Sequence, residues 1–348
     1  MSDRAPARLD PRAWLVWGVA ASAPALLGRN PFVLTATLLA VLGARGAWHA
    51  AGPGTAGWRS LLRLTLVFAA ISILFNVLTA HVGNQVILHL PSAAPIVGGP
   101  LTLNALVYGV LSAIAVLTLV LVGTTLGVVL DWTALLRLLP PRLSTVAVAG
   151  SVAWAFIPQT ATALTEIREA QMARGHRPRG VRDLVPLVAP LLAGGLERAL
   201  TLAEALESRA FGAPLGATIE TEPHPWRSIV TVAGLTTGIA GAYVLATGQT
   251  AIAVVLLAVT AVALFVVGRD PAGGERPRRT RYREPDWGRS ETAIAGTAGV
   301  VLLVEMVTLA LDPAALAYDP YPDLVAPRVA LPLLAALALL LAPAAVAP

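Results

Sequence analysis

Long apolar stretches separated by short polar segments dominate the hydropathy pattern of this 348-residue chain. An α-helix needs about 20 mainly apolar residues to cross a bilayer, and several stretches approach or exceed that length. The alternating pattern of an outer-membrane β-barrel is absent from the sequence. The pattern therefore predicts an all-α, polytopic helical membrane protein. The predicted crossings are 13–28, 31–44, 61–80, 104–127, 227–246, 249–268, 291–311 and 329–347.

The distribution of arginines predicts the orientation of these crossings. The segment 128–226 holds nine arginines and the loop 269–289 holds seven, whereas the loops 81–103 and 247–248 hold none. Because basic residues are retained on the cytoplasmic side, we expect both termini to be cytoplasmic. A second interpretation is that the basic start and the step Ala21-Ser22-Ala23 form a cleavable secretion signal.

The composition excludes several kinds of chemistry. The chain is 56% hydrophobic and 13% charged, whereas soluble domains are about 25% charged. All 25 basic residues are arginines, so the lysine of a Walker A nucleotide site is missing. Without cysteine there are no thiolate metal sites and no disulfides. The five histidines lack ligand spacing; a weak metal contact of His81 and His89 is the less favoured interpretation. We expect no catalytic, cofactor-binding or metal-binding residues and no bound cofactor.

The segment 128–226 contains apolar runs that are too short to cross the membrane. The run LVPLVAPLLAGGL is 13 residues long with two prolines, and runs of this length are more often buried or interfacial helices than spans. This predicts helices at or below the inner membrane surface at about 131–139, 144–174 and 181–210. The expected organisation is N-terminal transmembrane helices in 1–127, these helices in 128–226, further transmembrane helices in 227–268, a basic cytoplasmic loop in 269–290 and a C-terminal transmembrane extension in 291–348.

Two of these predicted helices end in the same pattern, Glu-Ala-x-x-small-Arg-small. The first ends in Ala173-Arg174-Gly175 and the second in Ser208-Arg209-Ala210. Gly175 suits a left-handed cap after Arg174, and Pro178 cannot continue the helix. An arginine in the last turn complements the helix dipole, at about 0.3–1 kcal/mol, and this capping is one explanation. The other is docking, because small neighbours allow close approach and a guanidinium presents a planar fork to a carboxylate. The spacing alone leaves both explanations open.

The stretch around these motifs resembles the transmembrane T component (EcfT/CbiQ-like) of energy-coupling factor (ECF) transporters. The resemblance is clearest over 100–212 and rests on motifs in the same order: Phe156-Ile157-Pro158, Ala173-Arg174-Gly175, Pro186-Leu187 and Ser208-Arg209-Ala210-Phe211-Gly212. Two features depart from the family. The second motif is Ser-Arg-Ala where the family commonly has Ala-Arg-Gly, and the C-terminal extension adds spans of unknown role.

The resemblance implies a non-catalytic subunit that bridges two ABC ATPase subunits and a small membrane substrate-binding S component. Residues 128–226 would then form coupling helices. Their six motif residues, Ala173, Arg174, Gly175, Ser208, Arg209 and Ala210, would dock on the ATPases, one motif on each. ATPase closure would move these helices, tilt the S component and release a vitamin or metal ion inward. The choice of substrate would belong to the S component.

Three other functions remain as alternatives. A conventional ABC permease would use Glu169-Ala170 with Gly175 in its cytoplasmic loop. A secondary transporter would need ionisable or polar residues within the membrane, for which Asn76 and Glu305 are the candidates. A membrane-embedded enzyme is disfavoured because the spans hold no clustered catalytic side chains. We expect the basic loop 269–289 to contact anionic lipid or to set topology, and we expect no nucleic-acid partner.

Overall fold

The computed structural model describes residues 9–48, 55–90, 98–130, 132–136, 138, 144–175, 185–209, 211, 225–268 and 287–347. The chain divides into two compact units. Unit 1 comprises 1–131, 229–269 and 281–348, and unit 2 comprises 132–228 and 270–280. The structure does not determine how the two units are placed relative to each other, and each is described by itself.

Unit 1 is helical at each of the eight stretches where the hydropathy pattern predicts a crossing. Its helices are α1 (Pro11–Leu27), α2 (Pro31–Trp48), α3 (Thr55–Thr79), α4 (Leu103–Val129), α8 (Pro225–Ala246, entering from unit 2), α9 (Thr250–Gly268), α10 (Arg289–Leu311), α11 (Leu331–Ala338) and α12 (Ala342–Ala345). By length and composition, α2, α3, α4 and α10 can cross a membrane within the described residues. In the other predicted crossings the fully described apolar part is at most 17 residues long, namely Pro11–Leu27, Ile229–Leu245, Ala251–Ala263 and Leu331–Ala345, so eight crossings remain a prediction.

Local signals in the sequence explain where several helices begin. Asp10 precedes Pro11 and its carboxylate accepts from the backbone N–H of Arg12 at 2.8 Å, which starts α1. Asn30 acts in the same way before Pro31, accepting from the N–H of Phe32 at 3.0 Å. The hydroxyl of Thr102 accepts from the N–H of Ala105 at 3.3 Å at the start of α4. Each cap pairs an N–H that the first turn would otherwise leave without a partner.

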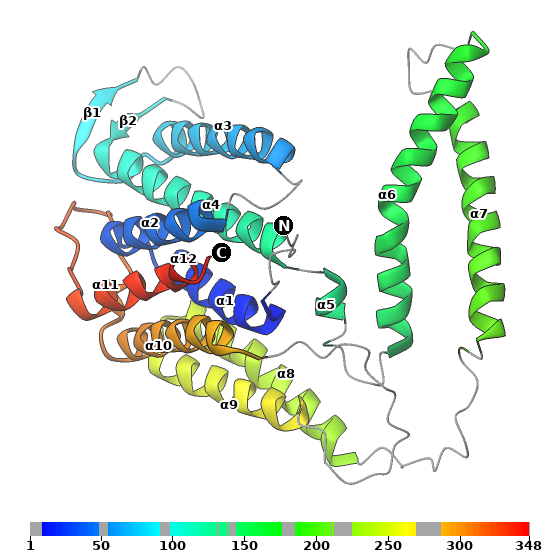
Figure 1. Cartoon of the computed structure of the whole chain (residues 1–348). Coiled ribbons are helices and arrows are strands. Elements are labelled where there is room, and N and C mark those ends of the chain that lie inside the picture. Colours follow the sequence, from blue (N-terminus) through cyan, green and yellow to red (C-terminus); the bar gives the residue numbers. More distant parts are fainter. Residues whose placement is uncertain are drawn as a thin grey trace. The chain divides into compact units, whose positions relative to one another are not determined.

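The core of unit 1 joins the N-terminal helices to the C-terminal extension. Small residues on α1 and α10, such as Ala13, Ala20 and Ala298, are fully buried where these helices pack together. Trp14 and Trp17 are also fully buried in this core. The extension is thus an integral part of the helical unit, and Figure 1 shows α10 and α11 lying against α1 and α2.

Two details of unit 1 correct the sequence prediction. The segment 81–103, predicted only as a loop, contains an antiparallel pair of strands, β1 (Val86–His89) and β2 (Pro100–Thr102). The stretch 329–347 was expected to be one helix, but a 3-10 turn, η5 (Leu339–Leu341), separates α11 from α12. Pro343 at the start of α12 cannot donate the backbone N–H that a continuous α-helix would need there.

Unit 2 consists of α5 (Trp132–Leu136), α6 (Ser144–Ala173) and α7 (Val185–Ser208) in its described part. All three lie within the helices predicted for this segment. Helices α6 and α7 pack side by side and run in opposite directions (Figure 1). The short α5 packs near the start of α6, where the rings of Trp132 and Trp154 lie 5.6 Å apart.

Candidate docking site at the helix ends

The first arginine motif lies exposed at the C-terminal end of α6. Ala173, Arg174 and Gly175 are all exposed. Gly175 has a φ of 84° and its N–H donates to the carbonyl of Met172 at 3.0 Å, so the predicted left-handed cap is present. Nothing lies within 4 Å of a side chain built at Gly175, and the backbone conformation alone explains this glycine. The motif therefore ends the helix on an open surface.

The second motif lies at the C-terminal end of α7. Ser208 and Arg209 are exposed, and the hydroxyl of Ser208 donates to the carbonyl of Ala205 at 2.9 Å. Phe211 folds back, its N–H donating to the carbonyl of Leu206 at 2.9 Å, and its side chain stays 43% exposed. Ala210 and Gly212 lie outside the described residues.

The two guanidinium groups bear on the choice between capping and docking. Among the described residues, neither Arg174 nor Arg209 uses its side chain in a hydrogen bond or ion pair. Arg198, in the middle of α7, behaves differently: its Nε donates to the carbonyl of Gly194 at 2.9 Å. A capping arginine would bind the last carbonyls in this manner. The geometry therefore gives no support for direct capping bonds. Among the described residues, no group binds either guanidinium, so that both can bind another molecule.

The two motifs lie at opposite ends of the helix pair. Because α6 and α7 run in opposite directions, Arg174 lies at one end of the pair and Arg209 at the other (Figure 1). At 1.5 Å per residue, the 30 residues of α6 extend over about 45 Å and the 24 of α7 over about 36 Å. One partner site small enough to bind a single helix end cannot receive both arginines, so the arrangement suits two separate sites.

An apolar stripe runs along α7 between these ends. Val188, Leu192, Leu196 and Leu200 are spaced four residues apart and are 48%, 61%, 66% and 65% exposed. Side chains at this spacing share one helix face. We did not identify this stripe from the sequence, although the spacing of four is visible there. A contiguous exposed apolar face usually marks contact with a protein or a membrane.

The residues considered for other chemistry belong to unit 1. His81 contacts the carbonyl of Pro100 at 3.4 Å, and His89 is exposed on β1. The described residues contain no group of three or more side chains that could hold a metal ion. Asn76 donates within its own helix to the carbonyl of Ser72 at 3.1 Å. Glu305 faces protein and not lipid, since it is 0% exposed in the core of unit 1.

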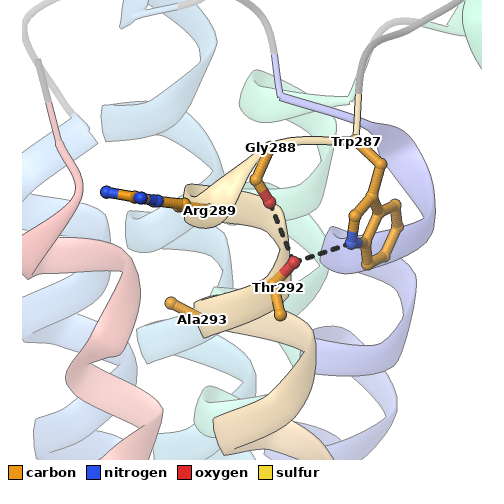
Figure 2. Close-up of a pocket in the computed structure, with 5 residues that line it drawn as sticks. All are labelled: Trp287, Gly288, Arg289, Thr292 and Ala293. Carbon is orange, nitrogen blue, oxygen red and sulfur yellow. Dashed lines mark hydrogen bonds between the residues drawn. The ribbon is translucent and has the colours of Figure 1, made fainter.

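A shallow hollow of about 550 Å³ lies at the start of α10 (Figure 2). The polar groups that Trp287, Gly288 and Thr292 contribute to it are already hydrogen-bonded. The indole N–H of Trp287 donates to the hydroxyl of Thr292 at 2.8 Å, and this hydroxyl donates to the carbonyl of Gly288 at 2.9 Å. The N–H of Gly288 is taken by the carboxylate of Glu291 at 3.0 Å. These contacts close the helix start, and we do not assign a ligand to it.

Comparison with known proteins identifies the family. The family model CbiQ, a cobalt transport protein, matches residues 2–218. This range includes α1 to α7 and both arginine motifs, and it ends before α8. A search of curated proteins finds no match. Because the match covers more than half of the 348 residues, the chain belongs to the CbiQ family of cobalt transport proteins and is a membrane component of a transporter.

Proposed function

We propose that this chain is the T component of an ECF-type importer. It would transmit the motion of two ABC ATPase subunits to a small membrane S component, which carries a metal ion or a vitamin inward. The observation that carries the proposal is the pair of exposed, unengaged arginines, Arg174 and Arg209, at opposite ends of two long antiparallel helices. This arrangement suits a pair of ATPases, each of which receives one helix end.

The chemistry of the motifs fits acidic receiving grooves. A guanidinium can form two parallel hydrogen bonds with one carboxylate, and the small neighbours Ala173, Gly175 and Ser208 keep the approach open. The chain needs such partners for energy because it has no lysine for a Walker A site. It would therefore act without catalysing any reaction itself.

The apolar stripe of α7 supplies a second contact. Leu192, Leu196 and Leu200 are each more than 60% exposed, and a hydrophobic S component is a suitable partner for such a face. A helix that is held by an ATPase at its arginine end and by the S component along its side would carry motion from one to the other.

With the coupling helices cytoplasmic, both termini are cytoplasmic in the plasma membrane of a prokaryote.

Purification tests this proposal. The full chain, isolated from its native membrane in mild detergent, should bring down two ATPase subunits and a separate small hydrophobic membrane protein. Recovery with ATPases and a second large permease would indicate a conventional ABC importer instead. Recovery without any ATPase would contradict both.

A further inference from the structure

The segment between α10 and α11, residues 312–330, is held by side chains of the N-terminal helices. The amide of Asn30 donates to the carbonyls of Ala315 and Arg328, both at 2.8 Å. The amide of Asn104 donates to the carbonyls of Pro320 and Pro322 at 2.6 and 2.9 Å. Both asparagines are at most 1% exposed. The segment is largely irregular, so these asparagines pair carbonyls that have no helix or strand partner.

Further contacts strengthen the same junction. The backbone N–H of Asn84 donates to the carbonyl of Pro322 at 3.0 Å, and its side-chain amide donates to the carboxylate of Asp323 at 2.6 Å. The ring of Tyr321 lies 5.7 Å from the ring of Tyr108. The guanidinium of Arg29, in the turn before α2, lies 4.7 Å from the centre of the Tyr108 ring on α4.

The last helical turns of the chain, η5 and α12, are also bound by side chains of the N-terminal helices. The indole N–H of Trp17 donates to the carbonyl of Leu340 at 3.0 Å, and that of Trp48 donates to the carbonyl of Pro343 at 2.8 Å. Leu340 lies in the 3-10 turn η5, and Pro343 lies in the first turn of α12. Four side chains from α1, α2, α4 and the turn before α2 thus hold six backbone carbonyls between 315 and 343.

We propose that α1, α2, α4, the loop at Asn84 and residues 287–347 move as one rigid block during the transport cycle. The extension would then stay packed on the N-terminal helices throughout the cycle, and their relative position would not change. Separating the two would break six hydrogen bonds, and three of them, to the carbonyls of Ala315, Pro320 and Leu340, are buried, so that their loss is costly. This inference rests on the proposed function for its transport cycle, but its structural part concerns unit 1 alone.

A reversible chemical cross-link tests the rigid block in the complete complex. The chain has no cysteine, so Asn84→Cys with Asp323→Cys provides the only two thiols in this chain. Both positions are exposed, and a short reducible bis-methanethiosulfonate can join them. We expect ATP hydrolysis by the purified complex to stay within about twofold of its rate before locking. A fall of tenfold or more that dithiothreitol reverses would overturn the proposal.

A second test does not depend on the ATPases. A specific protease site inserted between 269 and 286 allows the purified full chain to be cut. We expect the fragment that contains 287–348 to remain with the N-terminal fragment through size-exclusion chromatography in mild detergent. Separation of the fragments would overturn the rigid block even if the ATPases co-purify. Retention without any ATPase would leave the block standing and contradict the proposed function.

Discussion

The indole N–H of Trp17 donates to the carbonyl of Leu340 at 3.0 Å, although 323 residues separate them. Trp14 lies one turn before Trp17, with the two rings 5.6 Å apart in an edge-on arrangement. Both indoles are fully buried, but the N–H of Trp14 has no partner among the described residues. Two neighbouring tryptophans thus differ in whether their N–H group is bonded.

This difference makes Trp17→Phe and Trp14→Phe a matched pair. Both changes remove a similar ring area, but only Trp17→Phe breaks a hydrogen bond, at a cost of about 0.5–1.5 kcal/mol. We expect Trp17→Phe to lower the Tm in detergent more than Trp14→Phe does. An equal or larger loss in the Trp14 variant would show that the bond to Leu340 does not hold the extension.

Glu305 is expected to be replaceable by an apolar residue without loss of stability. It is 0% exposed, and neither carboxylate oxygen has a hydrogen-bond partner among the described residues. A buried polar group without a partner costs free energy, so Glu305→Leu should keep or raise the Tm. Glu291→Leu is the control: it removes the bond to the N–H of Gly288 and should cost about 0.5–1.5 kcal/mol. Clear destabilisation by Glu305→Leu would reveal a partner for this carboxylate.

Hydropathy and local signals predict most of the elements, because helix position depends on residues close together in the chain. The cap at Gly175 follows from Gly175 and Pro178, and α6 and α7 fall within their predicted ranges. The hydrogen bond from the amide of Asn104 to the carbonyl of Pro320 joins residues 216 positions apart, and no periodic pattern in the sequence predicts it. The same is true of the role of the extension, which only the tertiary contacts reveal.

Asn104→Leu is expected to weaken unit 1 more than Asn76→Leu. The first change leaves the carbonyl of Pro320 and the N–H of Gln85 without their partner, and it removes one of the two donors to the carbonyl of Pro322. Each unpaired buried group costs about 1–3 kcal/mol. The second change removes only a bond to Ser72 within the same helix. Thermal unfolding followed by tryptophan fluorescence compares the two, and equal midpoints would contradict the role of Asn104.

Gly175→Ala and Gly248→Ala separate backbone strain from docking. Both glycines have a φ of 84° and open space where a Cβ would lie, so each change should cost about 1–2 kcal/mol of stability. Gly248 lies between α8 and α9 in unit 1, whereas the arginine motifs belong to unit 2. We expect only Gly175→Ala to weaken binding of the ATPases, because it also crowds the approach to Arg174. Equal ATPase recovery with both variants would indicate that Gly175 serves the helix end alone.

Co-purification of the ATPase subunits with arginine variants tests the central claim most directly. Removing one partner of a buried, hydrogen-bonded charge pair costs about 2–5 kcal/mol, and lysine cannot reproduce the bidentate fork. We predict that Arg174→Ala and Arg209→Ala each reduce ATPase recovery at least tenfold and that lysine at either position does not restore it. The variant with both alanines should recover no ATPase. The amount of the chain in the membrane should stay unchanged in every case. Arg168→Ala, which removes another exposed arginine of α6, is the control and should retain the ATPases. If the Arg174 and Arg209 variants retain the ATPases as well as the Arg168 variant does, the docking function is wrong.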